Sequence, residues 1–257
     1  MQRLLSFKKQ LPCIFSKYWA EFGLVSGNWF VVFRILFGLL LFGSTIRFWL
    51  NGWIESLYIL PTFHFKYYGF EWVQCPSPSI LYFLFIIQAI SALGFAVNFF
   101  PNYAIGAFFL SFTYVELIDV TPYLNHYYLV SVLSFLLVVA LRPKHNSLDS
   151  AKTNYPYISK VGLFCIKLVL SLVYFYGGIA KLNSDWLLEA QPLRLWLIGK
   201  SDMPYIGDWL LKPETAYFAA CFGCVFDLCV LFLLWNRRTI LFAYLLLSIF
   251  HITTALL

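Results

Sequence analysis

Charged residues are scarce in this sequence: they make up 12% of its 257 residues, whereas 61% are hydrophobic. Average soluble domains are about 25% charged and about 45–50% apolar. A soluble fold cannot bury such an excess of apolar side chains, but a bilayer accepts it, because the lipid-facing surface must also be apolar. The composition therefore predicts an all-α, polytopic membrane protein.

Several other features are missing. The sequence has no cleavable signal peptide pattern, no internal repeat and no low-complexity tract. The lack of a repeat weakens a transporter interpretation. Cys221 and Cys224 have a CxxC spacing, but they lie in an apolar run without a second ligand pair, so we interpret them as packing residues and predict no metal site. The net charge of +6 does not predict a nucleic-acid partner, because the basic residues form short clusters between apolar runs.

Apolar runs long enough to cross a bilayer recur along the whole chain. A spanning helix needs about 20 mainly apolar residues, and seven candidates meet or approach this length: Trp29–Leu50, Ile80–Phe99, Tyr103–Val120, Tyr123–Leu141, Val161–Ala180, Thr215–Trp235 and Thr239–Leu257. Residues 1–28 are predicted to form an interfacial segment. The last run reaches Leu257 with no polar flank, so we expect the chain to be a fragment of a longer protein.

Basic residues in the loops predict the orientation. Lys and Arg are more frequent in the segments that share a side with the N-terminus than in those on the other side, which places the N-terminus in the cytoplasm. The two long loops on the outer side, residues 51–79 and 181–214, are rich in aromatic side chains that suit the membrane interface.

Ionisable residues within the spans fall at two depths, and such residues are candidates for function because inserting them is costly. Arg34, Lys167 and Asp227 lie at similar depths in the inner half, which predicts a structural ion pair of Asp227 with Arg34 or Lys167. The outer half is richer and predicts an outward-facing polar pocket; its members are Arg47, Glu116, Asp119, Asn125, His126, Lys181 and His251.

Lys181 is the most informative member of the outer group. Tyr174, Gly178 and Lys181 share one helix face, and a glycine on that face allows close approach of a helix or a flat ligand. A partly desolvated lysine can act as a base, but a lysine that extends to the headgroups is an equally good interpretation. His126 by itself is better explained by packing, and Asn125 points to a different face because adjacent helical residues diverge.

Two stretches resemble the vitamin K-dependent γ-glutamyl carboxylase family, whose shared membrane module is called the HTTM domain. The first runs from Thr113 to Leu129 and contains Asn125-His126; the second runs from Tyr174 to Leu187 and contains Gly177-Gly178-Ile179-Ala180-Lys181-Leu182-Asn183-Ser184-Asp185-Trp186. The likeness covers nearly all of residues 1–257, with Gly177-Gly178 where the family often has Ala-Gly. The family's large C-terminal soluble domain is expected to be absent from this sequence.

The resemblance implies a mechanism. Lys181 would be the base that deprotonates vitamin K hydroquinone, whose anion reacts with oxygen, and the product would remove a proton from a glutamate that then takes up carbon dioxide. His126 and Asn125 would orient or hydrogen-bond the quinone oxygens, and His251 would line the same pocket. Tyr174 and Gly178, which share a helix face with Lys181, are also expected to bind the quinone. The expected partners are membrane lipid, the quinone and a protein substrate bearing Glu residues, with the site on the periplasmic or lumenal side. The alternative is a non-enzymatic membrane module that binds a quinone, a lipid or a partner protein.

Overall fold

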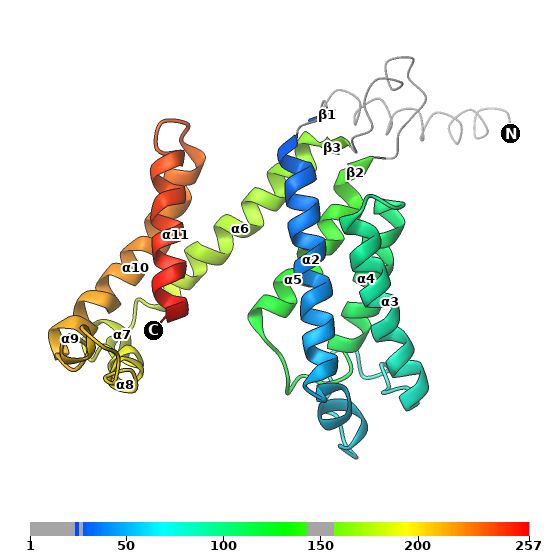
Figure 1. Ribbon diagram of the computed structural model, residues 1–257, viewed down its shortest axis with the longest axis horizontal. Helices are drawn as coiled ribbons and strands as arrows, with labels where there is room; N and C mark the ends of the chain where they lie inside the picture. Colours follow the sequence, from blue (N-terminus) through cyan, green and yellow to red (C-terminus); the bar gives the residue numbers. More distant parts are fainter. Residues whose placement is uncertain (1–23, 26–27, 143–156, 257) are drawn as a thin grey trace, which may run out of the picture. The chain divides into compact units, whose positions relative to one another are not determined.

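The computed structural model describes residues 24–25, 28–142 and 157–256, and helices dominate it (Figure 1). The chain divides into two compact units, unit 1 up to Ile166 and unit 2 from Lys167 onward. Residues 1–23, which include most of the expected interfacial segment and its basic residues Arg3, Lys8, Lys9 and Lys17, lie outside the described residues.

Unit 1 contains four long helices, each packed against the next in chain order: α2 (Asn28–Leu50), α3 (Pro78–Ala96), α4 (Pro101–Glu116) and α5 (Asn125–Ala140). Pro78 and Pro101 each stand at the first helical position, where a missing N–H costs nothing. The core between the helices combines aliphatic side chains with the aromatic rings of Phe30, Phe37, Phe95 and Phe108.

Short elements complete unit 1. The π-helical turn η1 (Glu55–Ile59) follows α2, and three short strands form an antiparallel sheet in the order β1-β3-β2. The strands are β1 (Leu24–Val25), β2 (Leu141–Arg142) and β3 (Tyr157–Ser159). This sheet joins the start of α2 to the end of α5.

Unit 2 holds most of α6 (Lys160–Ala180), together with α10 (Pro213–Trp235) and α11 (Ile240–Leu256). Three short helices, α7 (Ser184–Leu187), α8 (Leu193–Ile198) and α9 (Gly207–Leu210), lie in the segment between α6 and α10. They pack on α10 through a small core that includes Ala190, Leu197 and Ala216.

Four helices, α2, α3, α6 and α10, are long and apolar enough to cross a membrane, and α5 and α11 are shorter apolar helices. The predicted all-α membrane bundle is therefore confirmed, and each of the seven predicted spans corresponds to a helix. One boundary differs in a way that matters. The α4 helix ends at Glu116 rather than Val120, so Asp119 lies in the loop beyond it.

The predicted ion pair of Arg34 with Asp227 is wrong. Arg34 Nη1 donates hydrogen bonds to the carbonyl oxygens of Phe95 and Ala96, each at 2.7 Å, and the side chain is buried. The last carbonyls of a helix have no partner within the helix, so a cation there satisfies them and favours the negative end of the helix dipole. The sequence prediction failed because it considered only side chains as partners. Lys167, the other proposed partner, is exposed.

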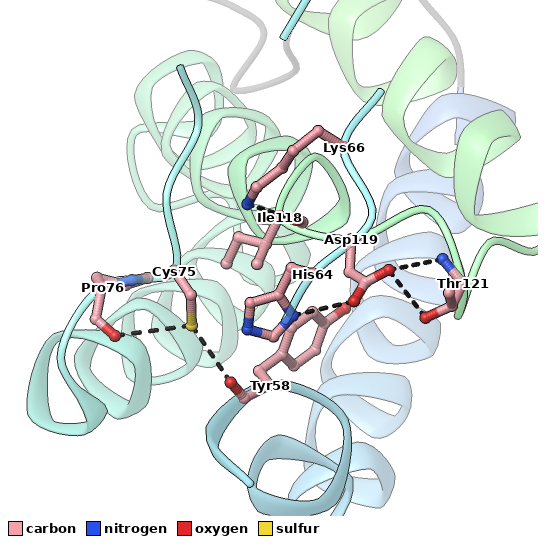
Figure 2. A network of polar contacts seen from close by, with 8 residues as sticks. All are labelled: Tyr58, His64, Lys66, Cys75, Pro76, Ile118, Asp119 and Thr121. Carbon is pink, nitrogen blue, oxygen red and sulfur yellow. Dashed lines mark hydrogen bonds and ion pairs between the residues drawn. The ribbon is translucent and has the colours of Figure 1, made fainter. Parts of the chain in front are cut away.

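At one end of unit 1, which we call the loop end, α2 and α4 finish and α3 and α5 begin. There the segment after η1 is fastened to the loop after α4 (Figure 2). His64 Nδ1 lies 2.9 Å from Asp119 Oδ2, and the Lys66 ammonium donates to the Ile118 carbonyl at 2.9 Å. The Val120 amide donates to the Phe65 carbonyl, also at 2.9 Å. These contacts join segments that are more than fifty positions apart in the sequence.

Asp119 is the centre of this network. Its Oδ1 accepts hydrogen bonds from both the amide and the hydroxyl of Thr121, each at 2.8 Å, and only 4% of the residue is exposed. Burial by itself raises the pKa of this carboxyl, but the hydrogen bonds from Thr121 and His64 outweigh burial and hold the pKa below its ordinary value. The folded protein therefore favours the ionised carboxylate more than the unfolded chain does.

This lowered pKa predicts an acid-dependent loss of stability. Because the folded pKa lies below the unfolded value of about 3.9, the stabilisation is present above that value and is lost as the pH falls through the folded pKa. Asp119→Asn should lower the free energy of unfolding at neutral pH by about 1–2 kcal/mol. The difference from the unsubstituted protein should shrink below about pH 4, as measured by thermal unfolding in detergent.

Asp202→Asn provides the matched control, because Asp202 is exposed. It should change the stability little at any pH. A constant difference between the Asp119 variant and the unsubstituted protein down to strongly acidic pH would contradict the role assigned to the carboxylate.

Candidate functional site

The Lys181 ammonium forms an ion pair with Asp227 of α10, inside unit 2. The Lys181 side chain is 21% exposed and that of Asp227 is 7% exposed. Of the two equally good interpretations, the structure therefore favours the desolvated lysine over one that extends to the headgroups. It also corrects the predicted partner of Asp227, which is neither Arg34 nor Lys167.

The geometry of α6 explains why depth along the sequence misled the prediction. Cα–Cβ bonds tilt toward the N-terminus of a helix, so a long side chain covers the turn before its own residue. A Cβ built on Gly177 would lie 3.4 Å from Asp227 Oδ2, which places the carboxylate about one turn before Lys181. The lysine reaches back along its own helix to meet it.

The residues that follow Lys181 fix its surroundings. Asn183 caps α7 by accepting a hydrogen bond from the Trp186 amide at 2.9 Å, and this turn places the indole beside the lysine. The Lys181 ammonium lies 5.2 Å from the centre of the Trp186 ring, a cation–π distance. Trp186 Nε1 in turn donates to the Ala220 carbonyl of α10 at 2.9 Å. The short motif thus holds the ammonium between a carboxylate and an aromatic face.

Gly178 brings α6 close to α10. A Cβ at this position would lie 2.7 Å from Leu228 Cγ and 3.0 Å from the Leu228 amide nitrogen, so any larger residue would push the helices apart. The prediction that glycine here allows close approach of a neighbouring helix is confirmed. The predicted contact of Gly178 with a quinone stays a prediction. Cys224 also packs here, with its Sγ 3.7 Å from the Gly178 carbonyl oxygen.

Tyr174 and His251 meet on the same side of unit 2. The Tyr174 hydroxyl lies 2.7 Å from His251 Nε2, which connects α6 with α11. The His251 ring is exposed, and the neighbouring Phe250 ring stacks on Phe226 with centres 4.3 Å apart. Tyr174 is seven residues before Lys181, or about 10 Å along the helix. Tyr174 and Lys181 therefore lie on one side of α6, where Tyr174 meets His251 of α11 and Lys181 meets Asp227 of α10.

His126 lies in unit 1, at a cavity of about 600 Å³ between α2, α3, α4 and α5. Most of the wall is apolar. Four polar lining residues lie near the loop end, Arg47, Glu116, His126 and Tyr127, and we call them the rim; other polar lining residues include Ser44, Thr45 and Gln88. The His126 ring packs edge-on against Tyr127, with ring centres 4.6 Å apart. Asn125 is exposed at the first turn of α5 and is not among the lining residues that the structure describes, as the divergence of adjacent positions predicted.

Sequence reasoning missed the role of Asp227 beside Lys181 and the presence of Gln88 in the cavity wall. Asp227 was assigned to structure alone, although a buried lysine needs a nearby anion and Asp227 is the acidic residue in the interior of α10. Gln88, a residue that lines the unit 1 cavity, was not singled out at all. An uncharged polar residue within the apolar run of α3 was the available signal.

The ion pair predicts an asymmetry between single and double substitutions. Asp227→Leu should lower the free energy of unfolding by about 3 kcal/mol, because it leaves an unpaired, mostly buried ammonium. Adding Lys181→Leu to Asp227→Leu should recover most of that loss, because an apolar pair is often as stable as a buried ion pair. Thermal unfolding in nanodiscs measures both variants. Additive losses in the double variant would contradict the coupling.

A family model described as the HTTM domain matches residues 24–257, which include both motifs and every predicted site residue. No solved structure matches the chain. Since the match covers most of the sequence, this integral membrane protein belongs to the HTTM domain family and is related to the vitamin K-dependent carboxylases.

Proposed function

We propose that this protein is a membrane enzyme that oxygenates a vitamin K-type hydroquinone to its epoxide, with Lys181 as the group that accepts the quinol proton. The observation that carries the proposal is the placement of Lys181: its ammonium turns into unit 2, toward Asp227 and Trp186. A lysine held in this way is positioned for chemistry rather than for anchoring at the headgroups.

The ion pair suggests how a lysine could serve as a base. The Asp227 carboxylate fixes the position of the Lys181 nitrogen. We assign the hydroxyl proton of the quinol to that nitrogen. Asp227 is then a positioning residue, and Lys181 is the residue that touches the substrate.

The oxygenation balances without a further cofactor. The quinol supplies four electrons to dioxygen, two as it is oxidised to the quinone level and two from the ring double bond that becomes the epoxide. One oxygen atom enters the ring as the epoxide, and the other leaves as hydroxide, which takes up a proton to become water. In the related carboxylases the strongly basic product removes the glutamate proton before carbon dioxide adds to the carbanion. We extend that half-reaction to this protein as part of the proposal, with a Glu-bearing protein as the substrate.

Several residues are assigned to the quinone by the resemblance. His126, at the rim of the unit 1 cavity, and Asn125, beside it in sequence, would hydrogen-bond or orient its oxygens. Tyr174, His251 and Gly178 are also assigned to quinone binding. The hydrophobic cavity supports the choice of a lipid-soluble ligand, since ligand sites are commonly apolar hollows of about 300–1,000 Å³ with a few polar groups. We propose that the N-terminus is cytoplasmic and that the site faces the periplasmic or lumenal side.

A non-enzymatic module is the second candidate, and the same ion pair is the observation in its favour. Buried ion pairs serve packing in many proteins, and Lys181 with Asp227 could do no more than join α6 to α10. In that case the chain would bind a quinone, a lipid or a partner protein without turnover. The two candidates predict different results for a substitution that keeps the ion pair but removes the basic amine. In the enzyme it should stop epoxide formation, whereas the non-enzymatic module forms no epoxide in either form.

Lys181→Arg separates the two functions of the lysine. Arginine keeps the positive charge and the pairing with Asp227, but it stays protonated and cannot accept a proton. Membranes that contain this variant should form epoxide from reduced vitamin K at least about a hundredfold more slowly, as measured by chromatography of the product. Lys181→Ala should abolish epoxide formation.

Lys212→Arg is the matched control, because Lys212 also lies over a tryptophan, with its ammonium 4.6 Å from the Trp209 ring centre. It should retain the activity of the unsubstituted protein. Normal epoxide yield from Lys181→Ala would refute the proposed chemistry and leave the non-enzymatic module as the better account.

A further inference from the structure

A groove of about 560 Å³ runs between α6 and α10 within unit 2, and we call it the unit 2 groove. Apart from Ser171 and Asn236, the lining residues that the structure describes are apolar. Several of them are exposed, among them Phe232 at 64%, so the groove is open rather than enclosed. The apolar lining comes from successive turns of the two helices: Leu168, Leu172 and Phe175 on α6, and Leu231, Phe232 and Trp235 on α10.

A change in the spacing of the two helices creates the groove. The helices run antiparallel, because Gly178 meets Leu228, whereas Ser171, earlier on α6, meets Trp235, later on α10. At Gly178 the backbones are close, since a Cβ there would lie 3.0 Å from the Leu228 amide nitrogen. At Ser171 the long indole of Trp235 bridges the gap, with its Nε1 donating to Ser171 Oγ at 2.8 Å. The two backbones therefore separate toward the turn that joins α10 to α11.

Three basic residues stand at this wider end of the groove. Lys167 lies one turn before Ser171 on α6, and its carbonyl accepts a hydrogen bond from the Ser171 hydroxyl at 2.9 Å. Arg237 and Arg238 directly follow the lining residue Asn236, whose side chain holds the turn by accepting from the Arg238 amide at 2.9 Å. All three basic residues are exposed. The groove thus joins an apolar wall to a cationic end, which we call the basic end.

Acidic residues are absent from the basic end within the described part of unit 2. Those of unit 2 lie either in the segment 185–214, at the opposite end of α10, or at Asp227. Asp227 pairs with Lys181 and lies eight residues before Trp235, about 12 Å along the helix. None of the three basic residues forms an ion pair with another described residue. Three cations without a counter-charge favour an anionic ligand.

We propose that the unit 2 groove binds an anionic phospholipid, with the phosphate at the basic end and an acyl chain along the apolar wall. The guanidinium groups of Arg237 and Arg238 match phosphate oxygens with paired hydrogen bonds. The methylene groups of the chain would cover Leu172, Phe175 and Phe232. In the orientation proposed above, the basic end lies at the cytoplasmic leaflet, whose anionic lipids attract basic residues beside a span.

Other ligands leave part of this site unused. A quinone or a sterol would cover the apolar wall but would bring no charge to the basic end. An acidic peptide would neutralise the cations, but its backbone polar groups would lie unsatisfied against the apolar wall. The inference does not depend on the proposed quinol chemistry, because neither Lys181 nor Asp227 is among the groove-lining residues that the structure describes.

Removing the three charges tests the contact with the phosphate. Native mass spectrometry of the full chain in a neutral detergent measures the binding of phosphatidylglycerol and of phosphatidylcholine with the same acyl chains. The unsubstituted protein should bind phosphatidylglycerol about a hundredfold more tightly, as three basic residues beside an anionic lipid predict. The triple variant Lys167→Gln, Arg237→Gln, Arg238→Gln should bind the two lipids alike.

A second triple variant is the matched control. Arg194→Gln, Lys200→Gln and Lys212→Gln together remove the same charge from the segment between α6 and the interior of α10, away from the groove lining. This variant should keep the preference for phosphatidylglycerol. An equal loss in both triple variants would show attraction to the overall charge and would overturn the inference, as would an unsubstituted protein without the preference.

Leu172→Trp tests the groove itself, because the larger side chain fills the space without changing the charge. It should weaken phosphatidylglycerol binding about tenfold, the loss expected when about two methylene groups no longer pack. Val173→Trp is the control, since Val173 is exposed on the same helix and is not among the described lining residues. It should bind phosphatidylglycerol normally. Unchanged binding in Leu172→Trp would refute the assignment of the acyl chain to the groove.

Two further results would assign the groove to another occupant and so overturn the inference. Displacement of the lipid by glycerol phosphate, which has no acyl chains, would indicate a site for phosphate alone. A dimer of the lipid-free protein that Leu172→Trp separates into monomers would indicate that a second copy of the chain covers the groove.

Discussion

The hydrocarbon core of a bilayer offers no water, so a charge or a hydrogen-bonding group placed there must find its partner within the protein. The described residues meet this constraint in distinct ways. Arg34 satisfies the carbonyls at the end of α3, and Lys181 is neutralised by Asp227 and covered by Trp186. A few buried polar atoms of the described residues have no partner, among them Arg34 Nε and Gln88 Nε2. The paired lysine carries the functional proposal.

The helices could be predicted well because the signal for them is strong. Long apolar runs have few alternatives to helix in a membrane, and each predicted span corresponds to a helix of the structure. Partners were harder to predict. Asp227 has three candidate cations in the sequence, and equal depth favoured Arg34 or Lys167, whereas side-chain direction and length decide for Lys181. Depth along the chain is a poor guide where a lysine can reach back a full turn.

The loops and the cavity were beyond sequence reasoning for another reason. The contact of His64 with Asp119 joins two loops that are distant in the sequence. No sequence pattern around either residue predicts that contact. Glu116 and Asp119 were both predicted within the Tyr103–Val120 span, but α4 ends at Glu116, so Asp119 lies in the loop beyond it. His126 could be named from the Asn-His motif, yet its place at the rim of a cavity depends on the packing of four helices.

The central claim is that this HTTM protein oxygenates a quinol to the quinone epoxide. The most direct measurement supplies purified protein in nanodiscs with reduced naphthoquinone under oxygen gas enriched in the heavy isotope, and analyses the product by mass spectrometry. The account predicts a quinone epoxide that carries one heavy oxygen atom from the gas, formed only in the presence of the protein. Recovery of quinone alone, or of an epoxide whose added oxygen comes from water, would contradict it.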